Sequence, residues 1–264
     1  MMIDDPTPVA ALQFDSLRAQ VFEDRAQLGR AAALHVARLI AARLAVADRA
    51  HVVFAAAPSQ REFLAGLVAH PSIEWHRVVA FHMDEYLGLD ADHPASFRRY
   101  LSEHLFRLAD LDGDRLHLIE GERRDRPLAA CLDYEEQLIA RPPDLVCGGI
   151  GENGHLAFND PGVADFLDPV GVKTVRLDLA CRAQQVADDC FSTLEDVPTH
   201  AITLTIPMLL SAASLSIVVP GPRKAEAVLA TLRGPIDESC PASALRRHPG
   251  AVLFLDRESA ALIL

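Results

Sequence analysis

Residues 144–161 read D-L-V-C-G-G-I-G-E-N-G-H-L-A-F-N-D-P, and this stretch decides how we interpret the fold. The run begins with the apolar pattern of a buried strand, and four glycines follow at close spacing: Gly148, Gly149, Gly151 and Gly154. Because glycine loses more backbone freedom on folding than any other residue, such a run indicates backbone close to a ligand or turns with positive φ. His155 and Asp160 lie just beyond, where the carboxyl end of a strand in an open α/β sheet would bind a ligand.

The same glycines match the G-x-G-x-x-G pattern of dinucleotide-binding proteins over Gly149 to Gly154. That pattern requires a long helix directly after the glycines, with its N-terminus facing the pyrophosphate. Here Pro161 and Gly162 follow within two turns and would stop such a helix. We therefore expect no nicotinamide cofactor at this loop.

Composition limits the classes of protein to consider. The 264 residues, of which 50% are hydrophobic, are enough for one large α/β domain. The formal net charge of −12 argues against nucleic acid or an anionic membrane as a partner, although an anionic small molecule needs only a few local cations. Five scattered cysteines without a C-x-x-C pair are typical of buried thiols in a reducing cytoplasm. Neither a signal peptide nor a membrane span is expected.

Strand-like and helix-like segments alternate along the chain. This predicts an α/β fold with a single doubly wound, mostly parallel sheet flanked by helices, as one domain over residues 1–264 with residues 1–8 frayed. The expected strands are residues 17–23, 51–57, 78–83, 116–119, 145–147, 172–178, 201–206, 215–219 and 251–256. One long helix is expected directly after Asp24, and another is expected to begin near Lys224. The remaining expected helices cover residues 61–69, 94–108, 127–140, 182–191 (with Asp188 and Asp189 on it), 207–212 and 241–248.

Polar residues follow three of these strands. Ser59 lies in a turn between a strand and a helix, where it could help to cradle a phosphate or cap the helix, and the residues alone leave both open. Asp84 and Glu85 are adjacent on an extended segment, so at most one should face a pocket. Lys224 begins a helix, where its charge opposes the helix dipole, and an anionic ligand would explain that placement. The spacing of the histidines predicts no metal site.

Two blocks resemble the signature segments of the glucosamine-6-phosphate deaminase (isomerase) family, whose superfamily includes 6-phosphogluconolactonase. They are F-H-M-D-E-Y-L-G-L at residues 81–89 and the glycine-rich run at 148–161, and shorter matches to the family follow in the expected order. After His155 the chain reads L-A-F-N-D-P, which is similar to the deaminase, whereas a lactonase more typically has a small residue and then Ser-Leu-Phe. The resemblance implies that glucosamine 6-phosphate, or a close analogue, is converted to fructose 6-phosphate and ammonia without a metal or organic cofactor.

The resemblance also implies residue roles. Asp84 corresponds to the acid/base that moves a proton between C2 and C1 of the opened sugar, and His155 to the histidine that opens the ring. Asp160 and Asn153 fall where the family usually has a glutamate and an aspartate that contribute to the same group. The substrate- and phosphate-binding residues implied in this way are Ser59, Gln60, Gly151, Gly154, Arg182 and Lys224.

Three features depart from the family pattern. The phosphate loop, usually rich in Gly and Thr, reads A-A-A-P-S-Q-R at residues 55–61; Asn153 is uncharged; and Asp160 is one methylene shorter than glutamate. These changes could retune the histidine or shift the substrate to another amino-sugar phosphate. Two alternatives stay open: a sugar-lactone hydrolase on the same fold, and a sugar-phosphate sensor without turnover. The sequence also leaves open whether copies of the chain assemble into a homo-oligomer.

Overall fold

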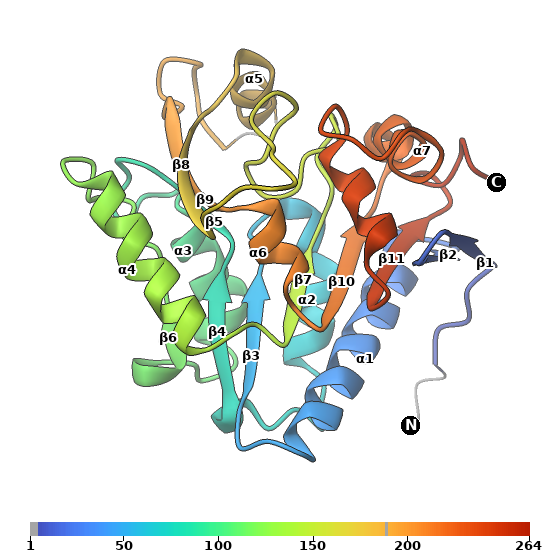
Figure 1. Cartoon of the computed structure of the whole chain (residues 1–264). Helices are drawn as coiled ribbons and strands as arrows, with labels where there is room; N and C mark the ends of the chain where they lie inside the picture. Colours follow the sequence, from blue (N-terminus) through green and yellow to red (C-terminus); the bar gives the residue numbers. More distant parts are fainter. Residues whose placement is uncertain (1–4, 188–189) are drawn as a thin grey trace.

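The computed structural model describes residues 5–187 and 190–264, so part of the frayed segment expected at residues 1–8 lies outside the described residues, as do Asp188 and Asp189. An eight-stranded sheet forms its middle layer (Figure 1). Every neighbouring pair in this sheet is parallel except β1 and β2, which confirms the predicted fold class. Across the sheet the order is β1 (Ala10–Phe14), β2 (Leu17–Phe22), β11 (Ala251–Asp256), β10 (Ser214–Val219), β7 (Leu145–Gly148), β3 (Ala50–Phe54), β4 (Val78–His82) and β6 (Leu116–His117).

Helices pack on both faces of this sheet. One face is covered by α1 (Arg25–Leu44), α2 (Arg61–Val68) and α3 (Phe97–Leu101), which continues as a π-helical turn. The other face is covered by α4 (Pro127–Ala140), α6 (Ile206–Leu210) and α7 (Ala225–Arg233). Val52 and Phe54 pack in the hydrophobic core between the sheet and helices α1 and α2, and Val53 packs in the core on the opposite face of the sheet. Strand β3 is therefore buried on both sides. This explains why β3 reads as a continuous apolar run.

Local sequence signals account for some element boundaries. The carboxylate of Asp24 accepts a hydrogen bond from the backbone N–H of Gln27 (2.7 Å) and caps α1, as expected. The helix expected over residues 127–140 has those bounds in α4. The helix expected over 182–191 is instead α5 (Leu179–Ala187), so it begins earlier than predicted.

A second, three-stranded antiparallel sheet was not predicted. It consists of β5 (Asp84–Tyr86), β9 (His200–Leu204) and β8 (Val172–Arg176), in that order. The carboxylate-bearing segment at residues 84–86 is therefore a strand of its own rather than the end of β4. In Figure 1 this small sheet and α5 lie beyond the carboxyl ends of β3 and β4. The small sheet therefore covers the edge at which an open α/β sheet binds ligands.

The order in which the strands are added to the large sheet reverses between β3 and β7. Strands β3 and β7 are hydrogen-bonded neighbours, but β4 and β6 lie to one side of them and β10 and β11 to the other. The loops that leave β3 and β7 therefore diverge. A crevice between diverging loops at the carboxyl ends of parallel strands is the usual binding site of this architecture.

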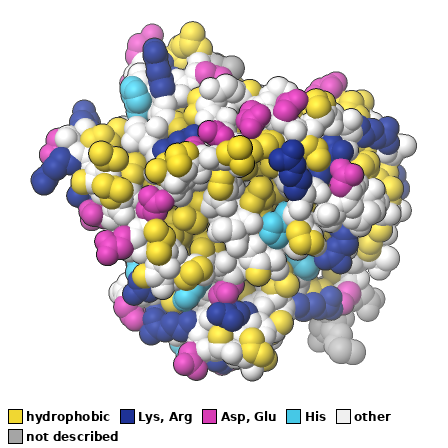
Figure 2. Space-filling model, in the orientation of Figure 1, with side chains coloured by type: hydrophobic (Ala, Val, Ile, Leu, Met, Phe, Trp, Pro, Cys, Tyr) yellow, Lys and Arg dark blue, Asp and Glu magenta, His cyan; other side chains and the backbone are white. Residues whose placement is uncertain are grey.

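The surface mixes apolar and charged side chains. On the face shown in Figure 2, acidic and basic side chains lie among hydrophobic ones. On α4, Leu128, Leu132 and Ile139 are exposed. Within the described residues, none of the helices combines the length and apolar character that crossing a membrane would require.

Candidate active site

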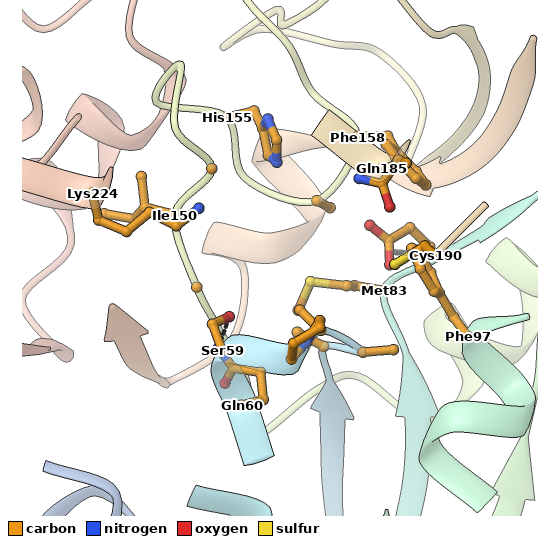
Figure 3. A pocket seen from close by; sticks show the side chains of 18 residues that line it. Ser59, Gln60, Met83, Phe97, Ile150, His155, Phe158, Gln185, Cys190 and Lys224 are labelled. Carbon is orange, nitrogen blue, oxygen red and sulfur yellow. Dashed lines mark hydrogen bonds between the residues drawn. The ribbon is translucent and has the colours of Figure 1, made fainter. Parts of the chain in front are cut away.

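A cavity of about 120 Å³ lies in the crevice between the loops after β3 and β7 (Figure 3). Strand β5 and helix α5 close it from the side of the small sheet. Its walls include Ser59, Gln60, Met83, Asp84, Phe97, Gly151, His155, Phe158, Gln185, Cys190 and Lys224. The cavity thus brings together one carboxylate, one imidazole and one ammonium group from segments far apart in the sequence.

Asp84 is the carboxylate of this cavity. Asp84 is 7% exposed. Burial raises the pKa of its carboxyl group well above the ordinary value, and the charge of Glu85 raises this pKa further. A carboxyl group tuned upward in this way can accept and return a proton closer to neutral pH.

Glu85, the next residue, faces the protein interior and is fully buried. Its carboxylate accepts hydrogen bonds from the side chain of Ser96 (2.8 Å) and from the backbone N–H groups of Tyr86 (2.9 Å), Phe97 (3.2 Å) and Arg98 (3.0 Å). The guanidinium of Arg98 adds a salt bridge at 3.3 Å. Glu85 therefore satisfies the start of α3 and joins that helix to β5.

His155 is held by two oxygen acceptors. Its Nδ1 lies 3.0 Å from Oδ1 of Asp160 and 2.8 Å from Oδ1 of Asn153. The Asn153 amide in turn donates from Nδ2 to Oδ1 of Asp160 at 2.9 Å. Since both partners of Nδ1 accept, Nδ1 carries a proton, and this assigns Nε2 as the ring nitrogen available to a ligand. In Figure 3 the ring of His155 extends into the cavity.

The glycines of the central loop make room for this histidine. A Cβ on Gly151 would lie 2.1 Å from Cε1 of His155, so only glycine allows the ring to rest on the loop. Gly154 has a φ of 85°, and a Cβ there would lie 2.8 Å from Sγ of Cys240. Gly151 lines the cavity, whereas Gly154 packs against Cys240 and does not line the cavity.

The candidate phosphate-binding residues gather at one end of the cavity. Ser59 and Gln60 lie in the short 3-10 turn (Pro58–Gln60) after β3, and Lys224 lies at the start of α7. Gln60 is anchored by its Nε2, which donates to the carbonyl of Val218 at 3.2 Å. No side-chain cap forms at the starts of the turn or of α2, so Ser59 does not cap a helix. An adjoining hollow of about 310 Å³ shares Ser59 and Lys224 and also includes Arg25.

Arg182 is not brought to this group. It lies on α5, and its Nη2 donates to the carbonyls of Leu194 and Val197, the latter at 2.9 Å. Gln185, three residues later, lines the cavity in its place. The sequence did not indicate that Gln185 lines the cavity, because no local pattern shows which face of α5 points toward it. In this structure Arg182 is not among the residues that line the cavity.

Comparisons with known proteins show the family to which the chain belongs. The profile of the family described as "Glucosamine-6-phosphate isomerases/6-phosphogluconolactonase" matches residues 23–254. The chain is 36% identical over 205 residues to a glucosamine-6-phosphate deaminase of Listeria monocytogenes, covering 78% of this chain and 84% of that protein. A glucosamine-6-phosphate deaminase of Shewanella woodyi is 37% identical over 190 residues, covering 71% and 69%.

Solved structures show the same relationship. A protein described as a monomeric glucosamine-6-phosphate deaminase superposes with a TM-score of 0.85 at 28% identity, covering 92% of this chain and 99% of that one. A 6-phosphogluconolactonase from Trypanosoma brucei has a TM-score of 0.79 at 17% identity, covering 97% and 100%. The second likeness, at that identity, is one of fold alone.

We predict that Gly151→Ala displaces the His155 ring, because the added Cβ has no space beside it. The backbone of Gly151 has an ordinary φ, so the fold should persist. Imidazole ¹⁵N spectra should show that Nδ1 has lost its hydrogen-bonded proton. Gly66→Ala on α2 is the control: Gly66 has no positive φ, its added Cβ would meet Ala33 rather than His155, and the His155 signals should not change. An unchanged His155 spectrum in Gly151→Ala would contradict the assignment.

We also predict that Glu85→Gln lowers the pKa of Asp84 toward its ordinary range, since a neighbouring negative charge is removed while burial remains. Carboxyl ¹³C titration by NMR measures this shift. The variant should also lose roughly 3 kcal/mol of unfolding free energy, because Arg98 loses its buried partner. Glu122→Gln removes the other, more exposed partner of Arg98 and should leave the pKa of Asp84 unchanged.

Proposed function

Since the chain belongs to the family of glucosamine-6-phosphate isomerases and 6-phosphogluconolactonases, we propose that it is an amino-sugar-phosphate deaminase. It converts glucosamine 6-phosphate, or a close analogue, and water to fructose 6-phosphate and ammonia. The observation that carries the proposal is the cavity that holds Asp84 together with an Asp160-supported His155. Its relatives with 35–37% identity are named as glucosamine-6-phosphate deaminases.

Ring opening is assigned to His155. Its Nε2 exchanges a proton with the ring oxygen of the bound pyranose, while Asp160 and Asn153 hold Nδ1 and set the direction of the ring. Asp160 is 1% exposed, so water does not compete for this contact. Asn153 has a role that an aspartate could not fill, because its Nδ2 donates to the carboxylate of Asp160.

Isomerisation is assigned to Asp84. Its ionised carboxylate removes the proton from C2 of the open-chain amino aldose and returns it to C1, which leaves an imine at C2. Positioned acid/base groups of this kind contribute on the order of 10²–10⁴-fold in rate. Water then adds to the imine carbon, and ammonia leaves with the proton that water supplies.

The phosphate is assigned to the end of the cavity with Lys224 and Ser59. Lys224 supplies positive charge, and Ser59 supplies a hydroxyl next to the N-terminus of α2, where unpaired N–H groups favour anions. The loop at residues 55–57 is made of alanines, and Pro58 lacks an N–H donor. Side chains therefore carry more of the phosphate binding than in a glycine-rich loop.

Two broader expectations belong to the same proposal. Cys131, Cys147 and Cys240 are free thiols within the described residues, which supports a location in a reducing cytoplasm. We also treat residues 1–264 as one catalytic domain, because the segments after β3 and β7, strand β5 and the residue before α7 all contribute to this cavity.

The test of the function is ammonia release from glucosamine 6-phosphate, with fructose 6-phosphate measured in parallel. Equal amounts of both products are expected, and free glucosamine should react far more slowly because Lys224 has no phosphate to bind. Galactosamine 6-phosphate serves as the epimer control. Absence of ammonia together with hydrolysis of 6-phosphogluconolactone would instead identify a lactonase. Thermal stabilisation by the sugar phosphate without product would identify a sensor.

We predict that Asp84→Asn removes isomerisation and raises the Tm at neutral pH. Burial raises the pKa of Asp84, so its protonated form favours the folded state, and that stability is lost as pH rises through the folded-state pKa. The neutral asparagine avoids this loss. The Tm advantage of the variant should vanish toward about pH 4, near the ordinary carboxyl pKa. Near-normal turnover, or a lower Tm at pH 7, would contradict the role of Asp84.

A further inference from the structure

Gln185 is a polar group in the cavity to which neither the resemblance nor the acid/base chemistry assigns a role. It extends from α5 into the wall that also contains Asp84, His155 and Phe158. In Figure 3, Lys224 and Gln185 lie toward opposite ends of the lining, with His155 between them. A substrate with its phosphate at Lys224 therefore directs its C1 end toward Gln185.

The orientation of the Gln185 amide is set by a buried tyrosine. The hydroxyl of Tyr86 donates to Oε1 of Gln185 at 2.7 Å. Tyr86 is fully buried, and its ring packs against those of Phe97, Phe158 and Phe191 at centroid distances of 4.9–5.4 Å. This packing holds the hydroxyl in place, and with it the amide.

Because Oε1 is occupied, the amide presents its Nε2 donors to the cavity. Within the described part of the chain, Nε2 of Gln185 makes no hydrogen bond to a protein acceptor. In Figure 3 this nitrogen is on the side nearer His155, and the oxygen is on the far side. A pair of N–H donors can bind an oxygen of the substrate but cannot accept from a protonated amine. The C2 amino group in its protonated form is thus excluded as its partner.

We propose that Gln185 donates a hydrogen bond to the oxygen on C1 of the open-chain substrate. This inference rests on the proposed deaminase function. When Asp84 removes the C2 proton, the electron pair of the C2–H bond moves into a C1–C2 double bond, and negative charge develops on the C1 oxygen. When the proton returns to C1, the nitrogen lone pair forms the C2=N bond, and the C1 oxygen becomes a hydroxyl by taking an N–H proton from that nitrogen. Gln185 stabilises the charge at the intermediate stage.

This role is distinct from substrate capture. A donor aimed at a charge that develops only during the reaction lowers the barrier more than it tightens binding of the starting sugar. The loss of one such donor typically lowers kcat by on the order of 10²–10³-fold. Gln185 is also neutral, so it leaves the raised pKa of Asp84 in place, as a cation at this position would not.

The experiment measures kcat and KM for deamination of glucosamine 6-phosphate by Gln185→Leu, Tyr86→Phe and the double variant. Gln185→Leu keeps the size of the side chain, and we expect kcat to fall by about 10²-fold with KM changed by less than about 3-fold. Tyr86→Phe should lower kcat less, since Nε2 remains but the amide can rotate. The double variant should be no slower than Gln185→Leu, because Tyr86 acts through Gln185.

Tyr134→Phe is the matched control. Tyr134 is another buried tyrosine, and its hydroxyl bonds to the backbone of His82 rather than to Gln185. Its effect should add to that of Gln185→Leu. Wild-type kcat in Gln185→Leu, a loss confined to KM, or additive effects of Gln185→Leu and Tyr86→Phe would overturn the inference. If the wild-type protein releases no ammonia, it is the proposed function that fails.

Discussion

The structure depends on burying two adjacent carboxylates on β5. Glu85 can be buried because the start of α3, Ser96 and Arg98 satisfy its oxygens. Without those partners the charge would cost several kcal/mol, so β5 and α3 must stay together. The same arrangement leaves Asp84 on the opposite side of the strand, where it faces the cavity and is kept from water. The alternation of side chains along the strand thus separates a structural carboxylate, Glu85, from the one to which we assign the acid/base role, Asp84.

Through α3, the anchoring of Glu85 also affects the other walls of the cavity. Phe97, beside the Glu85 carboxylate, lines the cavity, and the hydroxyl of Tyr100 donates to the carbonyl of Ala57 at 2.8 Å. The loop that would hold the phosphate is therefore tied to the same helix as the acid/base strand. A reaction that needs its groups within about half an ångström benefits from such shared supports. This gives Glu85 a positioning role without contact with a substrate.

The loop after β7 presents the imidazole of His155 to the cavity and supports it with a buried carboxylate, that of Asp160. Gly151 allows the His155 ring to rest directly on backbone. Asn153 and Asp160 then form a closed triangle of contacts with Nδ1. The two residues that depart from the family pattern are complementary to each other, since the amide donates to the shorter carboxylate. The departure thus removes one negative charge beside His155, while both residues still contact its Nδ1.

Much of this protein follows from its sequence alone. The apolar runs indicated most strands and helices, and two motifs led to the roles that we propose for Asp84 and His155, because periodicity and residue type are local properties. The tertiary structure decided the rest: the small sheet, the anchoring of Glu85, the direction of Arg182 and the entry of Gln185 into the cavity. The pairing of Tyr86 with Ala201 and the bond from Tyr86 to Gln185 each join residues about a hundred positions apart. Such contacts follow from how layers pack, and no local pattern in the chain encodes them.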